Sequence, residues 1–256
     1  MTVIKTGRVF SDVEMSWKVT LKSTMIPWPR LNGCTNTRGV DMPPKKFTYD
    51  KHEYNFSEII SQLFDVEDLS MVHEEWSSAK EYELLDNVKT DQLTVYHKHF
   101  YDNVEKFDWY ETYNKFVKTV IAEFFDEPML YQKIPTFRVH QPDNLAVAGY
   151  HRDMDYNHSE HEVNFFLPMT KAFGSNTIWV ESEMDKRDFA PMEADNGEFY
   201  MWNGAILLHG NKVNKTGKSR VSVDFRVLPE SKYVESDKKS GTYNVKFSIG
   251  DYFERM

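Results

Sequence analysis

The residues best suited to chemistry lie in the stretch 149–162, GYHRDMDYNHSEHE, which holds three histidines and four acidic residues. His151 and Asp153 stand two residues apart, so on an extended strand both side chains point to one face and can reach one metal ion. A third ligand has to come from elsewhere, and the best candidate is His209 in AILLHGN, at the end of an apolar strand where Gly210 leaves room near the ring. Two histidines and one carboxylate on one face of Fe(II) form a facial triad that leaves three coordination positions open.

Two other histidines in this stretch compete for the same role. His158 and Glu160 also have i, i+2 spacing, and His161 follows them directly. Both histidines stand in a polar segment that begins at Asn157, which is typical of a turn, whereas His151 follows the apolar AVAGY. We therefore predict that His158 and His161 are loop residues over the site rather than metal ligands.

The segment RVSVDFRVLP, 220–229, is expected to form a strand, and from Arg220 to Val227 it alternates strictly between polar and apolar residues, as a strand with two different faces does. Its apolar residues should pack under a helix, while its polar face can look into a barrel. On that face Arg220 supplies a guanidinium fork for a carboxylate and Ser222 a hydroxyl beside it. The pattern predicts a pocket for a cosubstrate that carries a carboxylate.

Two helices are expected before these motifs. FSEIISQLF, 56–64, has helical spacing, with Asn55 as a plausible N-cap and Glu58 completing a capping box. The longest helical pattern runs from Val104 to Phe125 and predicts a helix that covers a sheet. Its apolar stripe comprises Phe107, Tyr110, Phe116, Val120, Ile121 and Phe124. Nearer the N-terminus, the alternating segment 17–22 looks like a strand.

After Pro135 the texture changes to short alternating segments bounded by turn residues: TFRVH, EVNFFLP, NTIWVE, GEFYMW, AILLHG and RVSVDFRVLP. Many short strands at close intervals predict an antiparallel sandwich or barrel of jelly-roll type. No linker separates the helical part from the strands. We therefore expect one domain over 1–256, with a mostly helical and loop part at 1–130, a jelly-roll core at 131–230 and a C-terminal extension at 231–256.

Taken together, His151, Asp153, His209, Arg220 and Ser222 resemble the motif of the Fe(II)/2-oxoglutarate dioxygenases, which is His-x-Asp, a distal His, and an Arg-x-Ser soon after it. HEVNFFLPMT, NTIWVES and RVSVDFRVLP look more narrowly like the StrG-like and phytanoyl-CoA-hydroxylase-like branch. The resemblance covers roughly 136–229. It implies an α+β fold with a double-stranded β-helix core, cupin-like, and N-terminal helices packed on one face.

The resemblance also implies roles for individual residues. His151, Asp153 and His209 would bind Fe(II), and Arg220 with Ser222 would bind the distal carboxylate of 2-oxoglutarate. Thr177 sits where related enzymes place a hydroxyl against the same carboxylate. Arg226 is open at this point: in some relatives a second Arg touches the cosubstrate, but here it could equally pair with Asp224 or reach the substrate.

These roles imply an oxygenase that uses Fe(II), 2-oxoglutarate and O2 and releases succinate and carbon dioxide. Halogenases of this family replace the carboxylate ligand by Gly or Ala, so the presence of Asp153 favours hydroxylation or desaturation. A small polar metabolite, such as an amino acid or amino sugar, is the expected substrate. The alternative from another class is a non-catalytic jelly-roll that binds a metal or a small ligand, and Arg220 argues against it, because such a module needs no buried carboxylate fork.

Residues outside this constellation carry weaker signals. His97 and His99 in YHKHF alternate as on a strand, and we expect a solvated face there rather than a second metal site. Cys34 is expected to be a thiol without a role. Four residues are candidates for shaping the substrate pocket, although the tryptophan fits a core position equally well and the first asparagine could satisfy backbone groups: Tyr156, Asn164, Trp202 and Asn203.

Composition excludes several classes of protein. Of the 256 residues 40% are hydrophobic and 15% aromatic, and no run is long enough to cross a bilayer, which argues against a disordered or membrane-spanning chain. The net charge of -9 would repel a phosphate backbone, so no nucleic-acid partner is expected. The N-terminus lacks the apolar core of a secretion signal, and the one cysteine allows no intrachain disulfide, so a cytoplasmic location is predicted. The oligomeric state is unknown.

Overall fold

The computed structural model describes residues 42–79, 94–146, 149–241 and 244–256. The strand predicted at 17–22 and Cys34 lie outside these residues. Within them, no helix has the length and apolar character that a bilayer crossing requires.

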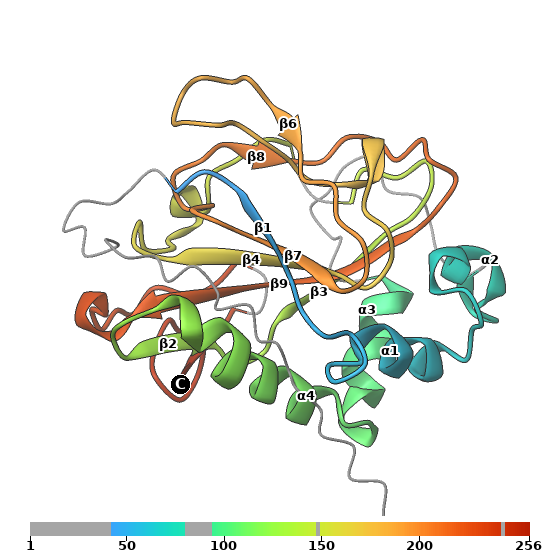
Figure 1. Cartoon of the computed structure of the whole chain (residues 1–256), viewed down its shortest axis with the longest axis horizontal. Coiled ribbons are helices and arrows are strands. Elements are labelled where there is room, and N and C mark those ends of the chain that lie inside the picture. Colours follow the sequence, from blue (N-terminus) through green and yellow to red (C-terminus); the bar gives the residue numbers. More distant parts are fainter. Residues whose placement is uncertain (1–41, 80–93, 147–148, 242–243) are drawn as a thin grey trace, which may run out of the picture.

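Two antiparallel sheets face each other, with the helices on the outer side of the larger one (Figure 1). In the large sheet the order is β1-β7-β4-β9-β2-β10, and β3 also pairs with β9; the small sheet has the order β6-β5-β8. The predicted α+β class, with a jelly-roll of antiparallel strands and helices on one face, is confirmed. The strands are β1 (Lys45–Thr48), β2 (Met129–Gln132), β3 (Thr136–His140), β4 (Val163–Pro168), β5 (Trp179–Val180), β6 (Ala190–Pro191), β7 (Glu198–Trp202), β8 (His209–Gly210), β9 (Arg220–Pro229) and β10 (Phe253–Arg255).

Strand β9 is the centre of the large sheet. It pairs with β4 on one side, and on the other side with β3 near its start and with β2 near its end. Its bounds, Arg220–Pro229, coincide with the predicted segment. Strands β1 and β10, which come from before 131 and after 230, belong to this same sheet.

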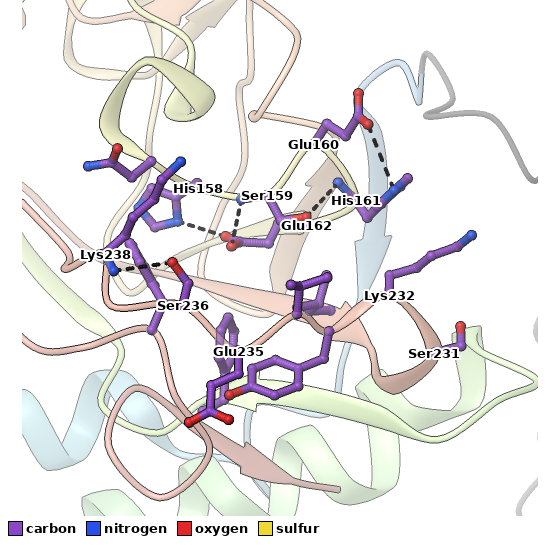
Figure 2. Close-up of a pocket in the computed structure, with 16 residues that line it drawn as sticks. His158, Ser159, Glu160, His161, Glu162, Ser231, Lys232, Glu235, Ser236 and Lys238 are labelled. Carbon is purple, nitrogen blue, oxygen red and sulfur yellow. Dashed lines mark hydrogen bonds and ion pairs between the residues drawn. The ribbon is translucent and has the colours of Figure 1, made fainter.

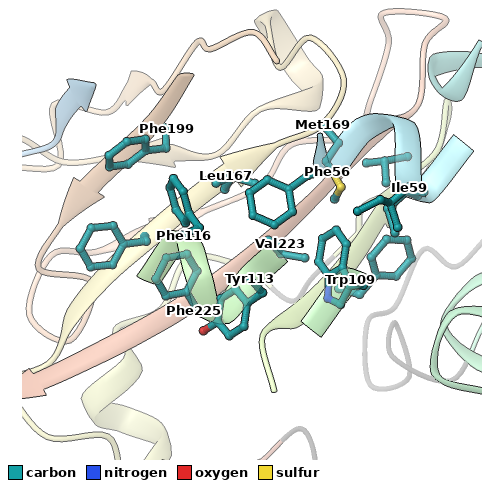
Figure 3. Close-up of a cluster of buried hydrophobic side chains, with 14 of the residues drawn as sticks. Phe56, Ile59, Trp109, Tyr113, Phe116, Leu167, Met169, Phe199, Val223 and Phe225 are labelled. Carbon is teal, nitrogen blue, oxygen red and sulfur yellow. The ribbon is translucent and has the colours of Figure 1, made fainter. Parts of the chain in front are cut away.

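The apolar face of β9 packs under the helices, as its alternation predicts. Phe225 lies 5.3 Å from Tyr113 of helix α4 (Trp109–Phe116), measured between ring centroids, and 4.9 Å from the stacked ring of Phe165. Figure 3 shows how rings from the helices and rings from the sheet meet in this layer. The opposite, polar face of β9 is thereby left to line the space between the two sheets.

Helix α1 (Phe56–Phe64) has the predicted bounds and Asn55 stands at its N-cap position, but the predicted capping box is absent. The side chain of Asn55 makes no capping hydrogen bond, and its backbone, at φ -78° and ψ 45°, lies outside the extended region that an N-cap normally adopts. The helix ends at Asp65, which has a left-handed conformation with φ 53°. Tertiary burial of Phe56, Ile60 and Phe64 therefore holds this helix without a side-chain cap.

The single long helix predicted from Val104 to Phe125 is wrong in its form. A 3₁₀ turn (Val104–Lys106) precedes α4, Phe107 is extended, and a π-helical turn (Val117–Ile121) and a second 3₁₀ turn (Ala122–Phe124) follow it. Phe116, Ile121 and Phe124 of the predicted stripe are buried, but because the chain restarts its helical phase after Phe107, α4 also buries Trp109 and Tyr113, which the stripe does not include.

The strand predicted at His97 and His99 is also wrong, because these residues belong to helix α3 (Val95–Asn103). Helix α3 is held to β3 by Phe100, whose ring stacks on Phe137 with centroids 4.1 Å apart. His97 is buried rather than solvated, and its Nδ1 shares a 2.6 Å hydrogen bond with the hydroxyl of Thr94. Among the described residues there is one further α-helix, the short α2 (Val72–Glu75).

Candidate metal centre and cosubstrate pocket

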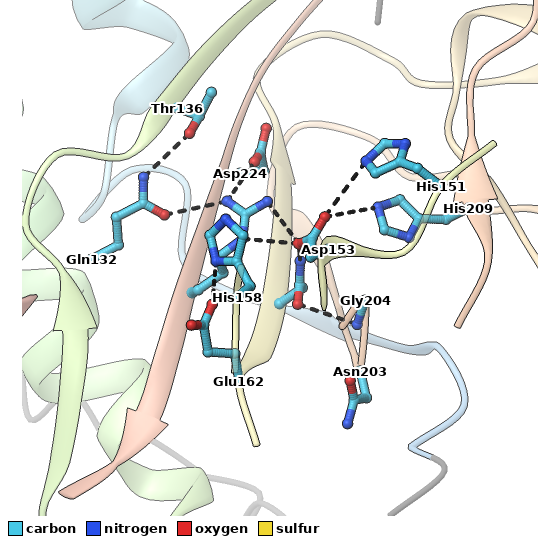
Figure 4. Close-up of polar contacts among 12 residues, drawn as sticks. Gln132, Thr136, His151, Asp153, His158, Glu162, Asn203, Gly204, His209 and Asp224 are labelled. Atoms are coloured by element: carbon cyan, nitrogen blue, oxygen red, sulfur yellow. Dashed lines mark hydrogen bonds and ion pairs between the residues drawn. The ribbon is translucent and has the colours of Figure 1, made fainter. Parts of the chain in front are cut away.

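The three predicted metal ligands converge between the two sheets. Nε2 of His151 lies 3.5 Å from Oδ1 of Asp153, and Nε2 of His209 lies 3.6 Å from the same oxygen. One ligand atom from each residue lies within 4.8 Å of the other two (Figure 4). Two imidazole nitrogens and one carboxylate oxygen at this separation form the donor set that suits non-haem Fe(II).

The backbone brings these residues together in a way that the sequence did not indicate. The extended strand predicted to carry both His151 and Asp153 is wrong. His151 forms an isolated bridge to His209, and Asp153 begins a 3₁₀ turn (Asp153–Tyr156). The N–H of Asp153 donates to the carbonyl oxygen of Gly204, at 3.0 Å. The apolar strand predicted before His209 is likewise wrong, because β8 has only two residues and 205–208 lie in turns and irregular backbone.

Gly210 has a different role from the one predicted. A Cβ atom there would lie 3.0 Å from Cα and 3.1 Å from N of Tyr150. The glycine therefore gives room to the backbone that leads into His151, rather than to the ring of His209.

The two histidine rings are held in the tautomer that metal binding needs. Nδ1 of His151 donates to the carbonyl oxygen of Gly149, at 3.1 Å, and Nδ1 of His209 donates to that of Leu207, at 2.9 Å. In a neutral ring with Nδ1 protonated, Nε2 carries the lone pair. Burial lowers the pKa of His209 to about 4. Both Nε2 atoms therefore face the site as acceptors for a cation.

Asp153 is buried and ionised. Burial alone would raise its pKa, but the Arg226 guanidinium holds the pKa well below the usual range. Its Oδ2 accepts hydrogen bonds from Asn164 and Arg226, whereas Oδ1 faces the two histidines. The residues present thus fit an Fe(II) ion, which would meet one anionic and two neutral donors.

A cavity extends from these histidines along the polar face of β9. It is lined by Arg138, His151, Asn164, Phe166, Ile178, Trp202, His209, Asn211, Arg220, Ser222, Asp224 and Arg226. Its volume is about 40 Å³, enough for water but too small for a keto acid unless wall side chains move. Arg220 is 1% exposed, and its Nη1 donates to the carbonyl oxygen of Asn176 and to Oδ1 of Asn211. A buried guanidinium with a hydroxyl neighbour on the same strand fits the distal carboxylate of 2-oxoglutarate.

The other two residues expected at the cosubstrate are engaged elsewhere. Thr177 is buried, and its hydroxyl donates to the carbonyl oxygen of Met192, at 2.5 Å; it is not among the residues lining the cavity. Arg226 lines the cavity, but its nitrogens donate to Asp153 and to Asp224. Of the alternatives left open for Arg226, the structure has the pair with Asp224.

Some residues of the site carried no recognised signal in the sequence. Arg138 of β3 donates from Nε to Asp224, at 2.8 Å, and Asn211 supports Arg220. Glu181 is fully buried and accepts hydrogen bonds from the backbone N–H of Leu208 and from the side chain of Arg152. Leu208 directly precedes His209 in the chain, and Arg152 stands between His151 and Asp153. The alternation in TFRVH places Arg138 on a strand face, but the partner strand, β9, could be identified only from the fold.

Of the four candidates for shaping the pocket, three contact a predicted metal ligand and the fourth, Asn203, contacts Glu160. Asn164 donates from Nδ2 to Asp153, and Trp202 lies edge-on to His209 with ring centroids 5.9 Å apart. Asn203 instead donates to the carbonyl oxygen of Glu160. Tyr156 is 48% exposed and meets the ring of His151 edge-on at 5.4 Å.

His158 and His161 lie in a loop, as predicted, and outside the group of candidate metal ligands. Nδ1 of His158 donates a 2.7 Å hydrogen bond to the carboxylate of Glu162. The two histidines line a separate and larger pocket of about 560 Å³, closed on the other side by 231–236 and by Phe247 (Figure 2). This pocket contains none of the three converging ligands, so its greater size does not make it the metal centre.

Comparison with known proteins gives one clear relative. No protein-family model matches the chain. The streptomycin biosynthesis protein StrG of Streptomyces griseus is 37% identical over 212 residues, which span 82% of this chain and 98% of that protein. Among solved structures, AviO1 from Streptomyces viridochromogenes Tue57 has a TM-score of 0.47 at 16% identity, covering 75% of this chain and 91% of that chain.

A further solved structure is the non-heme alpha ketoglutarate dependent carbocyclase SnoK from nogalamycin biosynthesis. It has a TM-score of 0.45 at 8% identity, covering 74% of this chain and 80% of that chain. The relationship to StrG is far stronger than either structural likeness, and a family assignment therefore rests on that sequence identity and on the ligand geometry.

Proposed function

The chain belongs to the StrG-like branch of the Fe(II)/2-oxoglutarate-dependent oxygenases, and from this premise we propose that it hydroxylates a small polar metabolite. Succinate and carbon dioxide would be released from the cosubstrate. The observation that carries the proposal is the convergence of His151, Asp153 and His209 beside a cavity whose wall contains a buried arginine. We also propose that residues 1–256 form a single oxygenase domain.

In this proposal each residue of the site has one task. His151, Asp153 and His209 hold Fe(II), while Arg220 and Ser222 hold the distal carboxylate of 2-oxoglutarate. Thr177 and Arg226 are not assigned to the cosubstrate, because their polar atoms already bond to Met192 and to Asp153 with Asp224. When bound, Fe(II) with 2-oxoglutarate and dioxygen supplies an oxidant strong enough to attack an unactivated C–H bond.

Part of the cavity wall is apolar. Phe166, Ile178 and Trp202 supply apolar surface beside the ligand atoms. A cosubstrate and substrate that displace water from the cavity would strengthen the interaction of Arg220 with a carboxylate and limit side reactions of the oxidant with solvent. The polar face of β9 and the apolar side chains across from it thus have complementary tasks.

The surface around the metal ligands supports a small substrate with a flat or ring-shaped face. Tyr150, Met154 and Tyr156 are all more than a third exposed, and they flank His151 in the chain. Exposed aromatic rings next to a reacting centre can stack against a ring of the substrate. The relative is named for the biosynthesis of streptomycin, which supports a small-molecule substrate.

The proposal is tested in two steps. Fe(II) and 2-oxoglutarate are first added to the protein under anaerobic conditions, and the charge-transfer colour of a chelated keto acid is expected with wild type but not with His151→Ala. Candidate amino acids and amino sugars are then screened for succinate release that depends on the candidate. A protein that binds no Fe(II), or that binds it without any keto-acid colour, would contradict the oxygenase proposal.

A further inference from the structure

One oxygen of Asp153 is occupied by protein donors and the other is not. Oδ2 accepts from Nδ2 of Asn164 at 2.7 Å, from Nε of Arg226 at 2.9 Å, and lies 2.8 Å from Nη2 of the same arginine. Three donors exceed the two lone pairs of a carboxylate oxygen. Oδ1, in contrast, faces Nε2 of both histidines, whose lone pairs cannot donate to it.

The two residues that hold Oδ2 are themselves fixed by the sheet. Asn164 of β4 and Arg226 of β9 are directly opposite each other in the antiparallel register. Asn164 is also held at its other end, because its Oδ1 accepts from the backbone N–H of Gly204, at 3.2 Å. A Cβ atom at Gly204 would lie 2.6 Å from Nδ2 of Asn164, so only glycine leaves this amide in its place.

Arg226 is held from the far side by a line of alternating charges. Its Nη1 lies 3.1 Å from Oδ2 of Asp224, and Oδ1 of Asp224 lies 2.8 Å from Nε of Arg138. Figure 4 shows His151 and His209 on one side of Asp153 and Asp224 on the other. Each buried charge in this line has an opposite charge next to it, which the low polarity of the interior requires.

We propose that Arg226, with Asn164, is a positioning residue for the metal centre: it restrains Asp153 so that only Oδ1 binds the metal. This proposal rests on the proposed iron site. If Asp153 could rotate, both of its oxygens could bind the ion and take up a coordination position that the cosubstrate or dioxygen needs. Arg226 therefore acts on the metal through Asp153 and does not contact 2-oxoglutarate.

The experiment uses Co(II) alone, without 2-oxoglutarate and without oxygen, and measures both its affinity and its visible spectrum, which reports the coordination number. Arg226→Gln removes the restraint on Asp153. It is combined with Asp224→Asn, which removes the other acid that Arg226 neutralises, so that the net charge of the protein stays the same. Gly204→Ala displaces Asn164 and keeps every charge. Arg255→Gln with Glu230→Gln is the matched control, because it removes an arginine and its acidic partner, 2.9 Å apart, from outside the metal site.

The double variant and Gly204→Ala should each bind Co(II) roughly 10- to 100-fold more weakly and show an altered spectrum. The control pair, Arg255→Gln with Glu230→Gln, should keep both the affinity, within about twofold, and the spectrum of wild type. Arg226→Lys should recover part of the affinity, because one ammonium still reaches Oδ2. Thermal unfolding of each variant identifies any that fail to fold. If the double variant does not fold, Gly204→Ala still tests the restraint on Asp153.

Two results would overturn the proposal. Unchanged Co(II) affinity and spectrum in the folded variants would show that Asp153 needs no restraint. A loss of 2-oxoglutarate binding by Arg226→Lys, with an unchanged Co(II) spectrum, would make Arg226 a cosubstrate ligand. Failure of the wild type to bind Co(II) or Fe(II) would instead contradict the proposed function itself, so the two failures are distinguishable.

Discussion

His151 and His209 exchange both of their backbone hydrogen bonds, with N–H to O=C distances of 2.9 Å in one direction and 3.0 Å in the other. Such reciprocal pairs place the two Cα atoms directly opposite each other across an antiparallel bridge. The two imidazoles therefore lie in the same site although the residues are far apart in the sequence. Because this contact uses backbone atoms only, it survives replacement of either side chain.

Substitution of the ligands should therefore remove the metal without unfolding the chain. We expect His151→Ala and His209→Ala each to abolish tight Fe(II) binding, since a two-ligand site keeps too few donors. His161→Ala is the control and should bind Fe(II) as wild type does, because its ring lies outside the triad. The measurement is Fe(II) or Co(II) titration of folded protein, and a His151→Ala variant with full affinity would disprove the assignment.

The parts of the fold that the sequence could predict are those with a repeated local pattern. Strand β9 repeats its polar and apolar alternation over eight of its ten residues, and α1 repeats its apolar spacing over nine, so the bounds of both are predicted correctly. In helix α3 the histidines suggested a strand, yet the buried Tyr96 and Phe100 have the i, i+4 spacing of a helix. The packing of this segment is decided by its apolar residues, whose spacing is helical, and not by the alternation of its histidines.

The geometry of the site could not be predicted in the same way, because long-range contacts create it. Strand β8 has two residues, and it is a strand only because β5 and His151 pair with it. Asp153 reaches the site from a 3₁₀ turn whose position depends on Gly204. The residue types that bind iron were visible in the sequence, whereas Arg138, Asn211 and the restraint on Asp153 depend on which strands lie side by side.

Removal of the carboxylate ligand should have two separable effects. In Asp153→Gly the buried Arg226 loses one of its two acidic partners, so the variant should unfold at a lower temperature than wild type; an unpaired buried charge costs on the order of 3 to 5 kcal/mol. Chloride can occupy the vacated position next to the guanidinium. We expect added chloride to raise the unfolding temperature of this variant more than that of wild type, and hydroxylation to fall sharply.

The outcome depends on Asp153 being both a ligand and the partner of Arg226. Full hydroxylation by Asp153→Gly, with chloride changing neither the product nor the unfolding temperature, would contradict both roles. Asp155→Gly is a suitable control, because this exposed acid belongs to the same turn but not to the group of ligands.

Buried His97 should make the protein sensitive to acid. Burial, and then the positive charge of Arg138, lower the pKa of His97 to about 3 from the ordinary value of 6.5. Above pH 6.5 the ring is neutral in both the folded and the unfolded chain, and its contribution to stability is complete. As the pH falls from 6.5 toward 3, only the unfolded chain takes up the proton, so stability should fall by up to about 1.4 kcal/mol per pH unit from this residue.

The measurement is urea unfolding at several pH values for wild type and two matched variants. His97→Gln removes the titrating ring and should flatten the decline between pH 6.5 and 3, whereas His52→Gln, at an exposed position, should leave it unchanged. An identical pH dependence for His97→Gln and wild type would show that the ring does not stay neutral in the folded chain.

The contact between Arg220 and the cosubstrate gives the sharpest separation of cosubstrate binding from metal binding. Arg220 is oriented before any ligand arrives, by Asn176 and Asn211 at its Nη1 and by the ring of Phe166, which lies 5.4 Å from its Cζ. Arg220→Ala would leave a buried carboxylate without its charged partner, which costs on the order of 3 to 5 kcal/mol, or roughly a hundred- to a few thousand-fold in affinity for 2-oxoglutarate. Arg220→Lys should recover only part of this, because an ammonium cannot make the two-pronged contact.

Asn211→Ala, which removes one support of the guanidinium of Arg220, should cost about 1 kcal/mol, or roughly fivefold in affinity for 2-oxoglutarate. Titration of 2-oxoglutarate into the anaerobic Fe(II) protein measures all three variants, with Fe(II) affinity determined separately and expected to stay close to wild type. If Arg220→Ala bound 2-oxoglutarate as wild type does, the carboxylate would have to lie elsewhere in the cavity, and the assignment of β9 as the cosubstrate wall would be wrong.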